Sequence, residues 1–199
     1  MHNFLPDGRR LILASKSPAR RKLLARLSLP FYIKPADIEE IVFPNEAAPA
    51  SVRRLAELKA RTVAHKHPAA LVIGADQVAV IDGEIIGKPG DHKRATDQLR
   101  HASGQKVTFY TGLCLFDSDS AKIQAVVESF FVVFRTLTSS MIESYLRREQ
   151  PYHCAGSLKS EGLGIALLER LEGDDPSSLI GLPLINLSRM LESAGVAIL

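Results

Sequence analysis

The sequence predicts a mixed α/β protein, for three reasons. The stretch Leu11–Leu24 begins with four apolar residues that suit a buried strand and, after a serine N-cap and a proline, becomes a basic helix. Residues 70–81 are the most apolar strand candidate, and Asp82-Gly83 then offers a tight hairpin turn. Two long β-type runs, 106–116 and 123–134, are joined by a polar turn and favour an antiparallel pair. Parallel-type and hairpin-linked strands are therefore expected together.

Shorter patterns predict the remaining elements. Helices are expected where apolar residues recur with helical spacing behind a capping signal: at 51–67, at 91–101 behind Asp91, at 140–148 behind the capping-box pair Ser140 and Glu143, and at 183–194 behind Pro183. Short strands are expected at 31–34, 84–86 and 165–168. Loops are expected where prolines, acidic residues or small residues gather without a period, at 35–49, 151–164 and 174–176.

Length and composition indicate one globular domain spanning residues 1–199. The chain has 46% hydrophobic and 24% charged residues, and its net charge of +3 is spread among interspersed acids and bases. A nucleic-acid coat would be more strongly basic, so nucleic acid is not an expected partner. No apolar run approaches the roughly 18 residues that cross a bilayer, and the polar N-terminus shows no leader. With only Cys114 and Cys154, we expect a reduced, cytoplasmic protein that is compatible with a homodimer.

The turn from strand to helix within Leu11–Leu24 suggests an anion site. Unpaired N–H groups at the helix start, the positive pole of the helix dipole and the guanidinium groups of Arg20 and Arg21 together favour a phosphate. The alternative is that Ser17 and Pro18 form an ordinary helix start, with paired arginines on a solvated face.

Charged residues near breaks in structure extend this hypothesis. Asp76 lies inside an apolar strand, where a carboxylate is costly without partners; it is a candidate general base or metal ligand, or it merely ends the strand. Glu40, in the acidic loop, is either a second oxygen ligand for a magnesium-type ion or a surface glutamate. Lys59 and Lys88 would join Arg20 in contacting a triphosphate. The alternative is that each of these basic side chains is simply exposed to solvent.

Other chemistries find little support. His153 and Cys154 are adjacent, but no second Cys or His lies at zinc-ligand spacing. Cys114 lies inside an apolar strand, where it is expected in the core rather than as a nucleophile. The glycines after residue 160 form neither a Walker loop nor a dinucleotide fingerprint, so kinase-type and Rossmann functions are set aside.

Six motifs, taken in order, resemble the Maf family of nucleoside triphosphate pyrophosphatases: LILASKSPARRKLL, IGADQV, GKP, SGQKVTFYTGL, CAGSLKSEGLG and LIGLPL. The resemblance runs from Leu11 to about Leu191. It implies an elongated mixed β-sheet with flanking helices in two lobes around a central cleft, similar to the inosine triphosphate pyrophosphatases. It also implies hydrolysis of a nucleotide between the α- and β-phosphates with a divalent cation, Mg²⁺ or Mn²⁺.

The resemblance further implies a role for each matching residue. Asp76 is the proton acceptor that activates water, the phosphate contacts are Ser15, Arg20, Lys59 and Lys88, and the metal ligands are Glu40 and Asp76. Residue chemistry alone had indicated each of these positions except Ser15.

Three positions bear on the base of the substrate. The branch acting on 7-methyl-GTP has Gln and Glu at the positions of Gln77 and Glu161, whereas the branch acting on dTTP and UTP tends to have Thr and Gln. Methylated guanine is positively charged, so the Glu161 carboxylate could pair with its N–H edge, or could instead pair with Lys159. Ala19 departs from both branches, which have Arg or Trp there, and implies weaker stacking or a broader substrate range.

Two other functions stay open at this point. One is a dTTP/UTP or broader nucleotide pyrophosphatase. The other is a non-catalytic nucleotide- or nucleic-acid-binding regulator of cell division, which the net charge of +3 permits but the set of charged candidate residues argues against.

Overall fold

The computed structural model describes residues 4–199; the first three residues of the polar N-terminus, where no leader is expected, lie outside the described residues. The chain forms two compact units. Unit 1 contains the residues up to Asp76, Thr111–Glu128 and Gly181–Leu199, and unit 2 contains Gln77–Tyr110 and Ser129–Ile180. A single domain over the whole chain stays a prediction.

Seven strands form one mixed sheet in the part of the chain that the structure describes. They are β1 (Arg10–Leu13), β2 (Tyr32–Ile33), β3 (Ala70–Ile81), β4 (Glu84–Ile86), β5 (Lys106–Asp117), β6 (Ile123–Phe134) and β7 (Leu168–Glu172). The strand order is β2-β1-β3-β5-β6-β7, with β4 paired to β3. β1 runs parallel to β2 and β3, whereas the β3–β4 and β6–β7 pairs are antiparallel. The predicted mixed α/β class is confirmed.

Six α-helices and two short 3₁₀ helices accompany the sheet in the described chain, residues 4–199. They are α1 (Pro18–Ala25), α2 (Ala48–Ala64), α3 (His92–Ala102), α4 (Ser139–Glu149), α5 (Pro176–Ile180) and α6 (Leu184–Ser193), with η1 (Ala155–Ser157) and η2 (Leu163–Leu167). The predicted N-caps of α1 and α3 are confirmed, because Ser17 and Asp91 accept hydrogen bonds from the third backbone N–H beyond them. Within the same residues each helix is too short or too polar to cross a bilayer.

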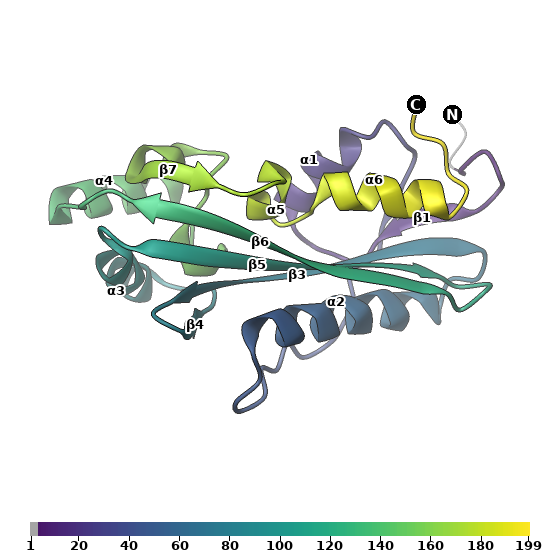
Figure 1. The fold of residues 1–199 in the computed structure, drawn as a ribbon, viewed down its shortest axis with the longest axis horizontal. Helices are drawn as coiled ribbons and strands as arrows, with labels where there is room; N and C mark the ends of the chain where they lie inside the picture. Colours follow the sequence, from purple (N-terminus) through teal and green to yellow (C-terminus); the bar gives the residue numbers. More distant parts are fainter. Residues whose placement is uncertain (1–3) are drawn as a thin grey trace. The chain divides into compact units, whose positions relative to one another are not determined.

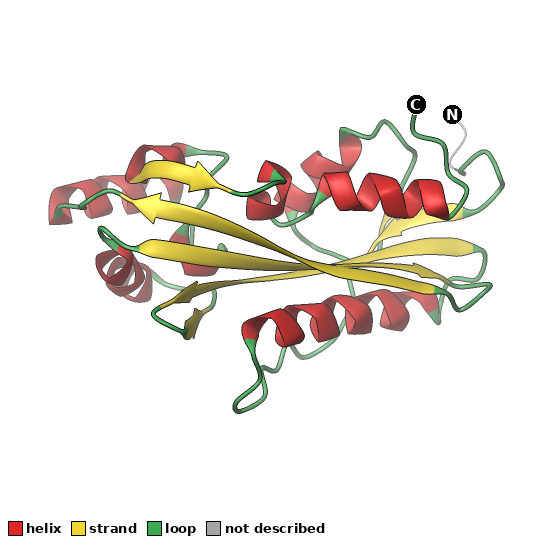
Figure 2. Cartoon of the chain, in the orientation of Figure 1, coloured by secondary structure: helices red, strands yellow, loops and turns green. Residues whose placement is uncertain are grey.

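In unit 1, helices cover both faces of the sheet. Figures 1 and 2 show α2 on one face and α1 with α6 on the opposite face. On the α2 side the buried core contains Ile12, Val72 and Cys114 from three strands, packed against Ala56 and Ala60 of α2. The small side chains of α2 let the helix backbone approach the strands closely.

Two glycines make that approach closer still. A Cβ atom on Gly74 would lie 2.1 Å from the carbonyl oxygen of Ala56, and one on Gly112 would lie 2.2 Å from that of Val52. The backbone of α2 therefore rests directly on β3 and β5, and only glycine fits at these contacts.

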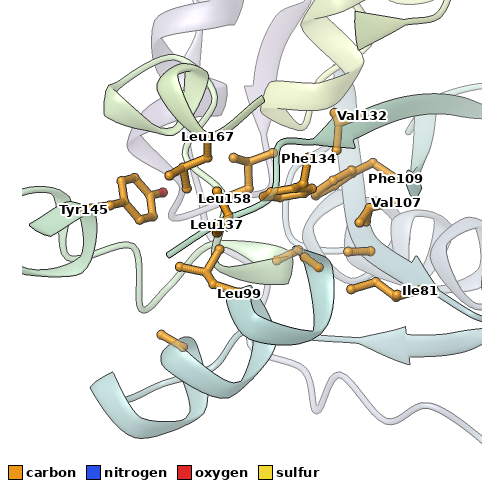
Figure 3. Close-up of a cluster of buried hydrophobic side chains, with 14 of the residues drawn as sticks. Ile81, Leu99, Val107, Phe109, Val132, Phe134, Leu137, Tyr145, Leu158 and Leu167 are labelled. Carbon is orange, nitrogen blue, oxygen red and sulfur yellow. The ribbon is translucent and has the colours of Figure 1, made fainter. Parts of the chain in front are cut away.

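Unit 2 has its own core, part of which is drawn in Figure 3. Phe109 and Phe134 are among its largest fully buried side chains. α3 packs against α4 and η1, and α4 also contacts η2. The helices and loops of unit 2 are therefore fixed to one another through shared apolar burial.

Two local predictions are wrong. The N-cap of α4 is Thr138, one residue before the helix, rather than Ser140, and the side chain of Glu143 bonds to His92 and Arg147 instead of closing a capping box. The strand expected at 165–168 is mostly η2, and the strand begins only at Leu168, where pairing with β6 starts. In both places long-range contacts override a local signal.

Candidate active site

The turn between β1 and α1 orients Ser15 and Arg20. Ser15 is buried, and its Oγ accepts a hydrogen bond from the N–H of Ser17 at 3.1 Å. The Arg20 side chain folds back over this turn, with Nη1 at 3.4 Å from Ser15 Oγ and Nε donating to the carbonyl of Gly181 at 2.7 Å. The turn thus presents a hydroxyl and a guanidinium at the start of a helix.

A buried lysine links two carboxylates beside this turn in unit 1. Lys59 Nζ lies 2.6 Å from Asp76 Oδ1 and 2.6 Å from Glu40 Oε1. Lys59 and Asp76 are only 5% and 6% exposed, whereas the Glu40 side chain is 44% exposed. Gly74 makes the pairing feasible, because it brings α2 against β3 two residues before Asp76. The structure therefore brings Glu40, Lys59 and Asp76 together.

Arg20 belongs to the same electrostatic neighbourhood. Burial lowers the pKa of Arg20, while the negative charges of Asp76 and Glu40 act in the opposite direction. An arginine keeps its proton under these conditions. Two cations and two carboxylates of unit 1 thus act on one another, with Ser15 bonded to the arginine.

The acidic loop that carries Glu40 is tied to α2 by one arginine. Arg54 donates from Nε and Nη2 to the two carboxylate oxygens of Glu46, both at 2.6 Å, and from Nη2 to the carbonyl of Ile41 at 2.8 Å. The same guanidinium lies 4.2 Å from the centre of the Phe43 ring. This bidentate pair holds the loop close to the buried lysine.

The Glu46–Arg54 pair predicts a specific acid sensitivity. Hydrogen bonding to Arg54 lowers the pKa of Glu46 from 4.5 to about 2, so the stabilisation is complete above pH 4.5 and is lost as the pH falls toward 2. Thermal unfolding of wild type and Glu46→Gln should therefore differ most above pH 5 and converge near pH 2. The control is Glu57→Gln, which breaks the more exposed Arg53–Glu57 pair of the same helix and should change the melting temperature less. A constant difference across this pH range would contradict the assignment.

The two carboxylates suit a magnesium ion that is bound partly by substrate, rather than a metal ion whose ligands all come from the protein. Asp76 and Glu40 supply hard carboxylate oxygens, and Mg²⁺ is commonly held by one or two carboxylates together with substrate phosphates. Among residues 4–199, no three or more His, Cys, Asp or Glu side chains gather into a metal-binding group. Any cation here would need further ligands from the substrate or from water.

Two predicted residues of unit 2 lie on well-fixed segments. Gln77 follows Asp76 directly on β3 and donates from Nε2 to the carbonyls of Ser178 and Leu179 at 2.9 and 3.0 Å. Lys88 is exposed in the loop between β4 and α3. That loop is held by hydrogen bonds from Gly156 N–H to the Gly87 carbonyl and from Gly90 N–H to the Tyr152 carbonyl.

Glu161, also in unit 2, is exposed in the turn between η1 and η2. Glu161 does not form the ion pair with Lys159 that the sequence allowed. Lys159 Nζ instead binds Glu149 of α4. Glu161 is therefore an exposed residue on a loop whose lysine is already paired with another carboxylate.

Sequence reasoning missed the buried residues that hold α5. Asp175 is 3% exposed and accepts from both the N–H and the Oγ of Ser177 at 2.8 and 2.5 Å. Ser178 donates its hydroxyl to the Asp175 carbonyl at 2.6 Å. The available signal is an aspartate before a proline, which predicts a turn but is equally typical of a helix start. These residues position the carbonyls that accept from Gln77.

The other singled-out residues take structural or surface places. Cys114 is buried, and burial raises the pKa of its thiol to about 12, as expected for a core cysteine. Burial also raises the pKa of Cys154. Arg21 is exposed, and Ala19 lies half-buried in the first turn of α1.

Residues 10–194 match the family described as Maf-like protein. The chain belongs to the Maf family. Among its relatives, the 7-methyl-GTP pyrophosphatase of Nitrosococcus oceani is 58% identical over 189 residues, which cover 95% of this chain and 95% of that protein. The 7-methyl-GTP pyrophosphatase of Vibrio cholerae is 53% identical over 189 residues, 95% of this chain and 97% of that protein. That of Polaromonas sp. is 51% identical over 193 residues, 97% and 88% of the two chains. The predicted family is confirmed along almost the whole chain.

Proposed function

We propose that this Maf-family protein hydrolyses a nucleoside triphosphate between its α- and β-phosphates, releasing a monophosphate and pyrophosphate, and that it prefers 7-methyl-GTP. The observation that carries the proposal is the buried Lys59 held between Asp76 and Glu40 beside the Ser15–Arg20 turn. Relatives that share 50% to 58% of their residues with this chain are named 7-methyl-GTP pyrophosphatases.

The phosphates are bound by the cations of the chain. Arg20 reaches phosphate oxygens as a planar, permanently charged fork, and Lys59 acts as a point charge. Lys88 contributes a third charge, and the Ser15 hydroxyl donates a hydrogen bond. In the described structure the Lys59 ammonium is paired with two carboxylates. When a phosphate binds, the ammonium turns partly away from these carboxylates and toward the phosphate.

Asp76 accepts the proton of the attacking water. Its carboxylate is buried, which shields it from bulk solvent and fixes its direction. When Lys59 turns toward the phosphates, its ion pair with Asp76 weakens and the carboxylate can accept a hydrogen bond from the attacking water. Glu40 and Asp76 would hold a divalent cation, Mg²⁺ or Mn²⁺, which when bound would neutralise charge on the phosphate oxygens.

The base is selected by residues of unit 2. Glu161 complements the positive charge of 7-methylguanine and accepts from its N–H edge. Gln77 is held by hydrogen bonds from its side chain to two backbone carbonyls. Ala19, in unit 1, cannot stack on a base as Arg or Trp would, so we expect a broader substrate range. We further propose that residues 1–199 form a single catalytic domain and that the protein is cytoplasmic. A homodimer is the proposed assembly, and light scattering can test it.

A pyrophosphate-release assay tests the activity directly. Purified protein is offered 7-methyl-GTP, GTP, UTP and dTTP with Mg²⁺ or Mn²⁺, and with a chelator in a parallel series. We expect metal-dependent release that is fastest with 7-methyl-GTP. Equal turnover of UTP and 7-methyl-GTP would remove the substrate preference, and absence of release from all four would favour the binding-module alternative.

The base assignment has its own prediction. Glu161→Gln keeps the size of the side chain but removes its charge, so kcat/KM for 7-methyl-GTP should fall about 10- to 100-fold, since a hydrogen bond to a charged group is lost. Turnover of GTP, whose guanine base carries no charge, should fall less. The control is Glu169→Gln, an exposed glutamate of β7 in the same unit. Unchanged preference in Glu161→Gln would rule out this residue as the base selector.

A further inference from the structure

The loop that presents Glu161 is a closed turn centred on Lys159. We call residues Ser157–Leu163 the Glu161 loop. The carbonyl of Lys159 accepts from the N–H groups of Gly162 and Gly164, both at 3.1 Å, which closes the chain around Glu161. The N–H of Lys159 donates outward to the hydroxyl of Tyr145 at 3.0 Å. The loop is thus held from outside by α4.

Glu149, also on α4, holds the opposite side of the same turn. Its carboxylate receives the Lys159 ammonium and accepts from Leu163 N–H at 2.7 Å. Lys159 lowers the pKa of Glu149, so the carboxylate stays charged. A Cβ on Gly162 would lie 2.5 Å from Glu149 Oε2, so the loop closes onto this carboxylate without room for a side chain.

Tyr145 completes the attachment from within the core. It is 5% exposed, and its hydroxyl donates to the Ser157 carbonyl at 3.0 Å while accepting from Lys159. Figure 3 shows this hydroxyl directed toward Leu158 and Leu167. Burial raises the pKa of Tyr145, so the hydroxyl keeps the proton that it donates. Tyr145 and Glu149 are four residues apart and share one face of α4.

We propose that Tyr145 and Glu149 are positioning residues that fix the Glu161 loop and thereby set how strongly the enzyme prefers a cationic purine base. The inference rests on the proposed function, in which Glu161 recognises that base. A carboxylate on a closed, externally held turn needs little further ordering when the substrate arrives, whereas a loose one must be ordered at the expense of binding. The effect concerns charge recognition, so it should separate methylated from unmethylated GTP.

The experiment compares kcat/KM for 7-methyl-GTP and for GTP in the full-length protein. The test variants are Tyr145→Phe, which removes only the hydroxyl, and Glu149→Ala. Glu149→Gln is the conservative variant, because its amide oxygen can still accept from Leu163. Matched controls are Tyr152→Phe and Glu143→Gln, whose polar groups contact His92 and Arg147 instead. Melting temperatures identify any variant that fails to fold.

The two test variants should each lower the ratio of kcat/KM for 7-methyl-GTP over GTP by about tenfold. Most of the loss should appear in KM for 7-methyl-GTP, with GTP turnover retained. Glu149→Gln should recover part of the ratio, and both controls should keep it. Adding Tyr145→Phe to Glu161→Gln should cause little further loss, since Tyr145 acts through the carboxylate that Glu161→Gln has already removed.

Three results would overturn the inference in distinguishable ways. If Glu161→Gln lowers the ratio but Tyr145→Phe and Glu149→Ala leave it at the wild-type value, α4 does not position the selector. If Glu161→Gln itself leaves the ratio unchanged, the proposed base assignment fails and this inference fails with it. A fall of equal size for both substrates would indicate a purely structural role and would also contradict it.

Discussion

Replacing Asp76 with asparagine should lower kcat for pyrophosphate release by about 10²- to 10⁴-fold, the usual contribution of a general base. Asparagine keeps the volume and can still accept from Lys59 Nζ, which lies 2.6 Å from Asp76 Oδ1, but it cannot take a proton from water. Lys59 would be less neutralised and more available to phosphate, so KM should stay equal or fall. Steady-state kinetics with 7-methyl-GTP measure both values.

Asp82→Asn is the matched control for this variant. Asp82 follows the same strand, is exposed and pairs with His101. Its φ of +49° is a conformation that asparagine also tolerates. Asp82→Asn should keep wild-type kcat. Near wild-type kcat in a folded Asp76→Asn protein would show that Asp76 is not the proton acceptor.

Substituting alanine for Gly74 should have the largest effect on stability. The new Cβ would lie 2.1 Å from the Ala56 carbonyl oxygen and 2.9 Å from the Ala60 nitrogen. Both are helix backbone atoms that cannot rotate away, so α2 must shift. We expect a loss of about 2 kcal/mol or more in the free energy of unfolding, which lowers Tm by about 4–8 °C in a protein of this size.

The same shift should reduce activity, because Lys59 moves with α2 away from Asp76. Displacements near 1 Å at a reactive site cost about 10²-fold in rate. Gly87→Ala is the control for stability, because nothing lies within 4 Å of a Cβ there. Denaturant and thermal unfolding of the two variants provide the measurement. Equal stability of Gly74→Ala and wild type would show that the close helix–strand contact is absent in solution.

Much of the fold could be predicted because its signals are local. The caps Ser17 and Asp91 act on residues within one helical turn, and the run at residues 70–81 became β3 with the same bounds. The α4 N-cap and the strand at 165–168 were wrong because distant partners decide them. The Glu143 carboxylate forms a hydrogen bond with His92 of α3 instead of with the backbone at the start of its own helix.

The candidate site was predictable only as a list of residues. Asp76 was suspected because a carboxylate inside an apolar strand needs a partner, but that partner could not be named from the sequence. The alternative pairing of Glu161 with Lys159 failed for the same reason, since Glu149 was not suspected. Likewise nothing local indicated that Arg54 holds the acidic loop through Glu46.

The class of fold, the family and the residue types available for phosphate chemistry follow from the order of residues alone, because motifs and periodicity are local properties of the chain. Which charges meet depends on how the helices and strands pack. Lys59 lies between Asp76 and Glu40 because Gly74 lets the backbone of α2 rest on β3. A buried charge without a counterion costs several kcal/mol, by the order of magnitude of its lost hydration. Burial therefore favours pairing with the oppositely charged side chains that the packing brings near.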